Sequence, residues 1–343
     1  MATWRSALNR LFASFSGGES SAMMTRLLLT RWRAKWDEVI VLFANTGEEC
    51  EETLEFVDRC DKAFSFGVVW LEAVVHHGER ASSTHRIVDF QTASRRGEPF
   101  EEVIKKYGLP GPGRLHCTRE LKLNVMLSYL ASVGWERGTY DTALGIRADE
   151  ATRRDGHNRN RVIYPLLDWF PITKAHVNEF WMKQRFRLRL TGYQGNCKWC
   201  WKKSLRKHMT LLSENPEKYD FPERMDAMYG TVGHEFDQGK AKYQQRVMFR
   251  GNLSTKDLRA AYEQNKDSLE KAEDNAIVLP GGDLFSLDLE EGGCVETCEV
   301  SFEQEQHMSL PSNAELAREA RDDEPGRDAP TASRLSAGLD CGG

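Results

Sequence analysis

Several features that define common protein classes are missing from this chain of 343 residues. No uninterrupted apolar run approaches the ~18 residues that a membrane-spanning helix needs, so we expect no membrane partner. Residues 1–10 carry scattered charge and lack the apolar core of a signal peptide, which predicts a cytoplasmic protein. The formal net charge of −5 gives no indication of a general polyanion binder.

A Walker-type phosphate loop is also absent, because no Gly-Lys-Ser/Thr follows a glycine at the required spacing. A different glycine turn is present. Ser16-Gly17-Gly18 stands between a short, mostly apolar stretch and a run of helical character. Glycine lets the backbone approach a ligand closely, and the free N–H groups of a helix start favour a phosphate. The hydroxyls of Ser16, Ser20 and Ser21 could cap that helix or bind the same oxygens.

The chain alternates short β-branched runs with helical stretches. We expect strands at residues 38–44, 68–75 and 139–146, and a helix at residues 48–59. This alternation predicts an α/β fold with a parallel twisted sheet flanked by helices. Ligands of such sheets bind beyond the carboxyl ends of the strands. Three loops follow predicted strands at that edge: Ser16-Gly17-Gly18, Asn45-Thr46-Gly47 and Gly145-Ile146-Arg147.

We predict three regions along the chain. A nucleotide-binding domain with a cysteine site spans residues 1–210, a helical appendage spans 211–280, and a disordered tail poor in apolar residues spans 281–343. Within the first region, residues 75–114 form an insertion rich in His, Arg and Lys. We interpret it as a solvated excursion or, alternatively, as a mobile lid over the substrate.

Five short strings occur in order along the chain. They are Ser14-Phe15-Ser16-Gly17-Gly18, Phe43-Ala44-Asn45-Thr46-Gly47, Cys117-Thr118-Arg119-Glu120-Leu121-Lys122, Gly145-Ile146-Arg147-Ala148-Asp149-Glu150 and Tyr164-Pro165-Leu166-Leu167-Asp168-Trp169. Together they are similar to the phosphoadenosine-phosphosulfate (PAPS) reductase family, especially its phage-type members, within the adenine-nucleotide alpha hydrolase (PP-loop) superfamily. The resemblance covers about residues 10–210 and implies that superfamily's fold, with PAPS or ATP as the ligand.

The resemblance also implies a nucleotide site. Phosphates would lie on residues 16–21, and the 45–47 loop would approach the adenosine. Guanidinium groups give paired donors that match phosphate or sulfate oxygens, although a solvated charge run is the alternative interpretation. Magnesium is a further cofactor that the resemblance allows, but the superfamily's usual loop Asp is Ser20 here, which counts against magnesium and adenylation chemistry. The predicted nucleotide-binding residues are Ser16, Gly17, Gly18, Ser20, Ser21, Asn45, Thr46, Gly47, Lys122, Gly145, Arg147 and Arg154.

The cysteines suggest a metal centre. Cys197-Lys198-Trp199-Cys200 places two thiols on one turn, and Cys117 lies about eighty residues upstream. Relatives that reduce adenylyl sulfate carry a Cys-Cys pair, a similar interval and then Cys-x-x-Cys, and bind a [4Fe–4S] cluster. In this chain the first Cys of that pair is His116. The predicted ligands are therefore Cys117, Cys197, Cys200 and His116, for a cluster or alternatively for zinc; a redox dithiol and structural thiols are the other interpretations.

The reaction is predicted from the resemblance. It implies thiol-dependent reduction of a sulfonucleotide, with a thiol or sulfur donor protein as partner. The family's mobile nucleophilic cysteine has only a faint counterpart in Asp340-Cys341-Gly342-Gly343, so the nucleophile is unassigned. One alternative is ATP-dependent sulfur insertion into nucleic acid, which the interleaved Trp and Lys of residues 199–207 would suit. The other is a non-catalytic nucleotide-binding protein.

Overall fold

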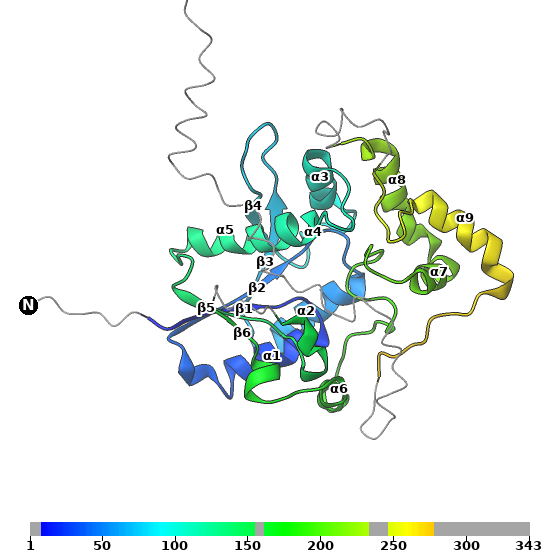
Figure 1. Cartoon of the computed structure of the whole chain (residues 1–343). Coiled ribbons are helices and arrows are strands. Elements are labelled where there is room, and N and C mark those ends of the chain that lie inside the picture. Colours follow the sequence, from blue (N-terminus) through cyan, green and yellow to red (C-terminus); the bar gives the residue numbers. More distant parts are fainter. Residues whose placement is uncertain (1–7, 155–160, 233–245, 278–343) are drawn as a thin grey trace, which may run out of the picture. The chain divides into compact units, whose positions relative to one another are not determined.

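A six-stranded sheet forms the centre of the computed structural model, which describes residues 8–154, 161–232 and 246–277 (Figure 1). The strand order is β4-β3-β2-β1-β5-β6. Every pair is parallel except β3 and β4, which are antiparallel. The predicted α/β fold is confirmed. The strands are β1 (Arg10–Ser14), β2 (Glu38–Ala44), β3 (Val68–Val74), β4 (Thr84–Val88), β5 (Tyr140–Ala143) and β6 (Val162–Ile163).

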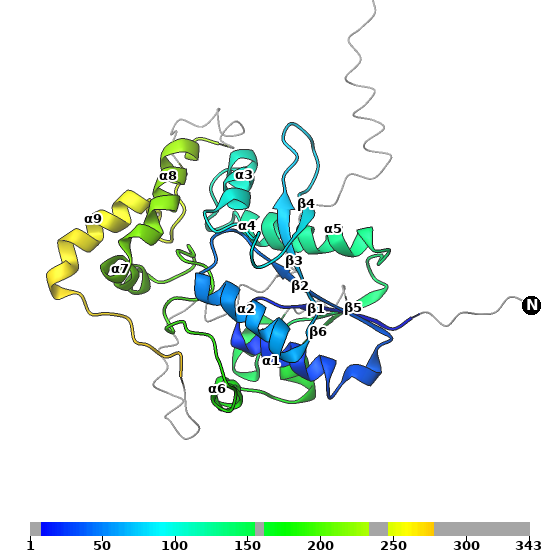
Figure 2. The same ribbon diagram turned by 180° about the vertical axis from the view of Figure 1, so that it is seen from behind.

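Helices cover both faces of the sheet, as Figures 1 and 2 show from opposite sides. Helices α1, α2 and α6 lie on one face and α5 on the other. The helices are α1 (Glu19–Leu29), α2 (Glu51–Phe64), α3 (Glu98–Tyr107), α4 (His116–Thr118), α5 (Asn124–Ser132), α6 (Lys174–Met182), α7 (Leu205–Glu214), α8 (Asp220–Tyr229) and α9 (Thr255–Asn265). Shorter turns are η1 (Arg33–Lys35), η2 (Arg119–Leu123), η3 (Ala148–Arg153), η4 (Pro165–Trp169), η5 (Pro216–Tyr219) and η7 (Lys266–Ser268).

Alternate residues of the central strands enter two separate cores. In β1, Leu11 and Ala13 pack toward α1 and α2, whereas Phe12 packs into the core that holds α3, α5 and α7. Successive side chains of a strand point to opposite faces, so a strand buried on both sides must be apolar almost throughout. This explains why β2 and β3 were recognisable in the sequence as continuous apolar runs.

The strand order places a switch point at β1. From β1 the chain runs outward through β2 and β3, and later returns to add β5 on the other side. Ser14 pairs with Leu42, and Ala13 pairs with Ala143, so β1, β2 and β5 end at the same edge. Loops that leave adjacent strands at a switch point diverge and open a ligand site. The glycine turn and the Gly145-Ile146-Arg147 turn both leave at this edge.

The insertion at residues 75–114 was interpreted wrongly as a solvated excursion. It contributes the antiparallel edge strand β4 and the helix α3. Phe100, Val103 and Ile104 of α3 are at most 3% exposed. They belong to the core on the face of the sheet that α5 covers, which we call the α5-side core. Charged residues on the other face of this amphipathic helix concealed its buried stripe.

Helices α7, α8 and α9 follow the sheet in sequence; α8 lies beside α3 in both views, and α9 packs on α8 and α7. They join the α5-side core through Leu211, Met225 and Leu258. The boundaries predicted at residues 210 and 280 stay predictions, and the predicted tail lies outside the described residues. No helix in the described part of the chain is long and apolar enough to span a membrane.

Candidate functional site

The glycine loop, residues 15–21, connects β1 to α1. Phe15 N–H donates to Leu42 O at 2.9 Å, which continues the ladder one residue past the strand. Gly17 then adopts φ +83°, and Gly18 is the N-cap of α1. The Ser21 hydroxyl donates to Gly18 O at 3.0 Å and lies 2.9 Å from the Ser16 hydroxyl. Two bonds of the Ser21 hydroxyl therefore link the two ends of the turn.

The loop presents amide donors at the start of an 11-residue helix. Across the described residues, no protein oxygen accepts from the amides of Gly17, Gly18 or Ser20. Free N–H groups at a helix N-terminus carry partial positive charge from the helix dipole and bind anions. The arrangement suits a phosphate or sulfate.

Arg147 reaches the same loop from the turn that follows β5. Its Nη1 donates to Ser20 Oγ at 3.1 Å, and its side chain is 2% exposed. Asp149 accepts from its Nε at 3.0 Å, and Glu150 lies 3.6 Å from Nη1. The acidic pair neutralises and orients a guanidinium that would otherwise be costly to bury. Arg147 and the glycine turn thus lie on the same side of the sheet.

Glu19 directly precedes Ser20, the position at which the superfamily usually has Asp, and its carboxylate has a structural role. Glu19 accepts from Arg187 through two bonds of 3.0 and 2.9 Å, and from Leu188 N at 3.3 Å. Its own backbone oxygen accepts from Trp181 Nε1. Glu19 therefore fastens α1 to the segment after α6. Magnesium stays a prediction.

The Asn45-Thr46-Gly47 turn is internally hydrogen-bonded. The Asn45 amide group donates to Glu72 Oε1 at 2.6 Å and to Ser94 O at 2.8 Å, and its oxygen accepts from Gly47 N. Thr46 donates through both N–H and hydroxyl to Glu49. The turn lies at the predicted edge, but its side chains shape the turn itself.

The remaining predicted nucleotide-binding residues differ in position. Lys122, on η2, lies 3.5 Å from Glu49 Oε1, so it faces the 45–47 turn. Gly145 is buried in the turn after β5. Arg154 is half exposed and pairs with Asp168 at 2.8 Å. The structure brings Arg147 to the loop but shows no contact of Arg154 with it.

The cysteine segment, residues 195–200, lies against the glycine loop. The Asn196 amide group donates to Ser16 O at 2.9 Å. Glu48 O accepts from Lys198 N and Asn196 O accepts from Cys50 N, at 3.0 and 2.7 Å. The Trp199 indole donates to the Glu48 carboxylate at 2.6 Å. Backbone and side-chain bonds from the start of α2 therefore hold the segment.

Burial changes the acidity of several groups here. Desolvation raises the pKa of the Glu48 carboxyl to about 7, opposed by the nearby Lys198 charge and the Trp199 bond. Burial likewise raises the pKa of the Cys50 thiol, which predicts an inert cysteine. Burial lowers the pKa of His116 to about 4, with a smaller effect from Arg119.

The predicted metal ligands differ in burial but share a suitable chemistry. Cys200 is buried, Cys117 and Cys197 are half buried, and a neutral His116 has the protonation state that a metal requires. The donor types thus suit a thiolate–imidazole centre. In residues 8–154, 161–232 and 246–277, however, no three His, Cys, Asp or Glu side chains form a group that could hold a metal ion. The [4Fe–4S] cluster and the zinc alternative stay predictions.

The interpretation of residues 199–207 as a stacking surface for nucleic acid is wrong for its tryptophans. Trp199 is 0% and Trp201 6% exposed. The Trp199 ring stacks on Phe221, with 5.8 Å between ring centroids. These indoles pack in the α5-side core, where no nucleotide base can reach them.

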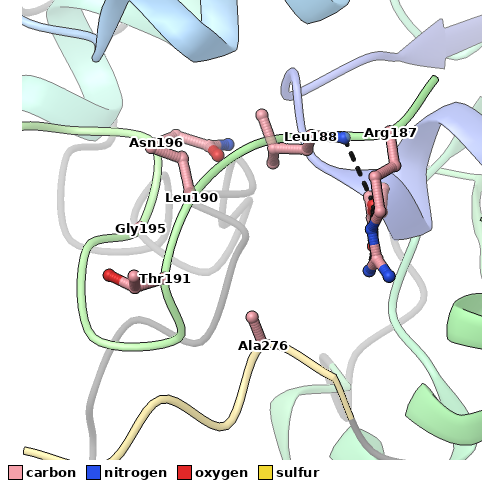
Figure 3. A pocket seen from close by; sticks show the side chains of 8 residues that line it. Arg187, Leu188, Leu190, Thr191, Gly195, Asn196 and Ala276 are labelled. Carbon is pink, nitrogen blue, oxygen red and sulfur yellow. Dashed lines mark hydrogen bonds and ion pairs between the residues drawn. The ribbon is translucent and has the colours of Figure 1, made fainter.

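Sequence reasoning missed Asn196, Glu48 and Arg187. Asn196 directly precedes Cys197, and Glu48 directly follows the predicted Asn45-Thr46-Gly47 turn, so adjacency to a motif could have indicated both. Arg187 had no such signal. Asn196 and Arg187 line a hollow between the glycine loop and the cysteine segment (Figure 3). It is lined by Glu19, Arg187, Leu188, Leu190, Thr191, Gly195, Asn196 and Ala276.

An open α/β sheet with a glycine loop and a buried arginine at its switch point belongs to the class of folds that bind ligands at that edge. Comparison with known proteins specifies the class further. The phosphoadenosine phosphosulfate reductase domain matches residues 10–184, and the chain belongs to this family. The predicted family is confirmed.

Relatives extend the comparison. The nin region protein ORF290 of Escherichia phage lambda is 28% identical over 292 residues, which is 84% of this chain and 93% of that protein. Protein MJ0973 of Methanocaldococcus jannaschii is 26% identical over 46% of this chain. Protein MJ0066 of the same archaeon is 26% identical over 53%. The chain spans about a third of each archaeal protein, at 32% and 33% of their lengths. None of the three names states an activity.

Proposed function

We propose that this protein binds an adenine nucleotide and reduces a sulfonucleotide, PAPS in the first instance, with thiols as the reductant. The observation that carries the proposal is the 3.1 Å bond from the buried Arg147 to Ser20 at the start of α1. It sets a guanidinium beside free amide donors, and such a combination recognises phosphate and sulfate oxygens.

The chemistry would proceed as follows. A thiolate attacks the sulfate sulfur, a sulfur–sulfur bond forms, and the sulfur–oxygen bond to the nucleotide phosphate breaks. A second thiolate then attacks the sulfur that came from the first thiolate. The sulfur–sulfur bond to the sulfonate breaks, which releases sulfite and leaves a disulfide between the two thiols. The two thiols supply the two electrons, and a thiol donor protein is the expected partner. The loop amides and Arg147 would stabilise the negative charge that develops on the departing phosphate.

The charge-retaining variant Arg147→Lys tests this role. Lysine cannot reproduce the fork that donates to Ser20 and Asp149 together. We expect kcat/KM for sulfite release from PAPS to fall about 100-fold, which corresponds to about 2.7 kcal/mol. The control is Arg259→Lys on α9, where the guanidinium pairs with Asp220 and Glu223 outside the site. Equal activity of the two variants would remove Arg147 from the mechanism.

ATP-dependent sulfur insertion into nucleic acid is the second candidate. The contact of Asn196 with Ser16 O favours it, because a sulfur carried by Cys197 or Cys200 would stand next to the loop. This reaction releases pyrophosphate from ATP, whereas the reductase releases sulfite from PAPS. If neither product forms but a nucleotide raises the melting temperature, the protein is a non-catalytic nucleotide binder. If neither nucleotide shifts the melting temperature, nucleotide binding itself is refuted.

A further inference from the structure

Acidic and basic residues are unevenly distributed along the chain. Residues 278–343 contain 15 of the 52 acidic residues but only 4 of the 47 basic ones. Their formal charge is −11, so residues 1–277 carry +6 although the whole chain has −5. The net charge of the chain therefore conceals an excess of cations in the part that contains the sheet.

Cations at one place on the described surface lack an acidic partner. Elsewhere exposed lysines are neutralised: Lys105 on α3 pairs with Glu102 at 2.6 Å, and Lys266 on η7 pairs with Glu263 at 2.8 Å. Three cations in and beside η1 form no ion pair with a carboxylate among the described residues. They are Arg31, Arg33 and Lys35.

Aromatic rings of η4 accompany these cations. Trp36 stacks on Trp169 with 5.7 Å between ring centroids, and Lys35 Nζ lies 3.9 Å from the centroid of the same ring. The next residue, Phe170, is 51% exposed, and the Arg31 guanidinium lies 5.8 Å from its ring centroid. These contacts join two segments into one surface, which we call the η1–η4 surface. It consists of Arg31, Arg33, Lys35, Trp169 and Phe170.

The acidic groups next to this surface are engaged by other residues. Asp37 accepts from Asn9 N–H at 2.8 Å, and Asp168 pairs with Arg154 at 2.8 Å. The η1–η4 surface therefore offers positive charge together with one open aromatic ring.

The combination of guanidinium groups and rings continues from the last turn of α1, on the face of the sheet that α1, α2 and α6 cover (Figure 1). The Arg26 guanidinium lies 4.5 Å from the ring centroid of Phe64 and 5.3 Å from that of Phe180. Arg59 lies 5.8 Å from the ring centroid of Phe186. Neither arginine pairs with a carboxylate in the described part of the chain. An extended polyanion thus meets further cations beyond the η1–η4 surface.

We propose that the η1–η4 surface binds single-stranded nucleic acid, with its cations on phosphate groups and Phe170 stacked on a base. Cations that neutralise phosphates supply affinity without sequence preference, and every base has a face that can stack on an aromatic ring. The tryptophans of residues 199–207 are buried and cannot serve in this way, whereas Phe170 is open. The inference goes beyond the proposed function and does not depend on nucleotide binding.

Other polyanionic partners fit this surface less well. A protein segment that enters a membrane surface presents several apolar side chains to it. Among the five residues of the η1–η4 surface, Phe170 is the one exposed apolar side chain. An acidic protein would match the cations but would leave the open ring unused.

Fluorescence anisotropy of the full-length protein with labelled single-stranded DNA and RNA of about 20 nucleotides tests the proposal. We expect a dissociation constant on the order of 1 μM at low salt, weakening as salt rises. The double variant Arg31→Gln, Lys35→Gln should bind about tenfold more weakly, and its salt slope should fall by about 1.4, which corresponds to two phosphate contacts. Arg33 stays unchanged because it donates to the backbone oxygens of Trp36 and Asp37.

The contribution of the ring is tested separately. Phe170→Ala should weaken binding about tenfold with little change in the salt slope, because stacking releases no counterions. Phe170→Trp should restore the affinity, since it keeps a ring for stacking. A merely structural role of Phe170 would lower the melting temperature of Phe170→Ala without weakening binding, and this result would overturn the proposal.

The matched control is Lys105→Gln with Lys266→Gln, which removes the same net charge from two lysines that are paired with carboxylates. It should bind as the unmodified protein does. Equal losses in the two double variants, or no binding to either single strand at low salt, would overturn the inference. Equal or tighter binding of duplex DNA or of polyglutamate would do so as well, and so would binding to phosphatidylserine vesicles without binding to nucleic acid.

The two proposals fail separately in this design. The substituted residues lie outside the glycine loop, so PAPS should shift the melting temperature equally in all variants. If PAPS shifts none of them while single strands still bind, nucleotide binding is refuted and the η1–η4 surface stands.

Discussion

The glycine loop and the cysteine segment lie in contact, yet they are held in different ways. The loop takes its conformation from the positive φ of Gly17 and from two bonds among residues 15–21, and the side chains of Arg147 and Asn196 bond to it from outside. The cysteine segment is held from about 150 residues away, by the backbone and side chain of Glu48 and by Cys50. One is a local motif, and the other is a loop that tertiary structure has fixed.

This difference determines how each region should respond to change. A local motif fails when its own residues are altered, because no distant group can restore a forbidden backbone conformation. A tertiary loop depends on buried partners elsewhere, so its stability follows their protonation and packing. Point substitutions test this contrast, and the glycine loop should show the greatest loss.

Replacing Gly17 with alanine should break the loop. The residue has φ +83°, and a Cβ there would lie 2.6 Å from Thr53 Cγ2 and 3.2 Å from Phe43 and Val57. Backbone strain and overpacking add, so we expect a loss of about 4 kcal/mol in the free energy of unfolding. Denaturant titration measures it.

Gly67→Ala is the matched control for this prediction. Gly67 has φ +64°, and a Cβ added there would meet no atom within 4 Å, so only the backbone term of about 1 kcal/mol applies. Equal losses for the two variants would show that contact with α2 contributes nothing to the loop.

Glu48 should make the stability of the protein depend on pH. Its pKa is raised from 4.5 to about 7 by burial, so between these values the folded state keeps a proton that the unfolded state has released. Stability therefore falls by about 3 kcal/mol as pH rises from 4.5 to 7 and then levels off. Glu48→Gln should abolish this fall and be the more stable form at pH 8.

Denaturant titrations at pH 5 and pH 8 provide the measurement. The control is Glu55→Gln, the same change at an exposed position of α2, which should leave the fall in place. A fall that persists in Glu48→Gln would locate its origin elsewhere in the protein.

Ser21→Ala should have the smallest effect and sharpens the description of the loop. It removes the hydroxyl that contacts Ser16 Oγ and Gly18 O, at a cost of about 1 kcal/mol. The exposed Ser132 makes a comparable bond to Tyr129 O, and Ser132→Ala should cost less than about 0.5 kcal/mol. Thermal unfolding of both variants measures the two losses of stability. A larger loss of stability in Ser132→Ala than in Ser21→Ala would contradict a stabilising role of the loop hydroxyls.

The sequence was informative wherever structure depends on neighbouring residues. The run 38–44 was predicted as a strand and is β2 with the same bounds. The helix predicted at 48–59 is α2 at Glu51–Phe64, shifted because the Glu48 and Glu49 side chains bond elsewhere. The glycine turn was found because a strand, a positive-φ residue and a helix start follow one another directly.

The sequence was least informative for contacts that join distant segments. Residues 75–114 have a polar composition, and only packing of α3 against the sheet shows that Phe100 and Ile104 are core residues. Trp199 and Trp201 were given an exposed role although they are buried. Composition cannot distinguish a wet face from a buried one when the covering elements come from elsewhere in the chain.

Sequence by itself determined the family, the alternation of strands and helices, and the glycine loop, because each depends on residues within a few positions or on strings in a fixed order. Tertiary structure alone decided that Arg147 meets Ser20 and that the Asn196 amide group donates to Ser16 O. Side chains more than a hundred residues apart meet only after the sheet has aligned the ends of its strands, and no local pattern records which of them will do so.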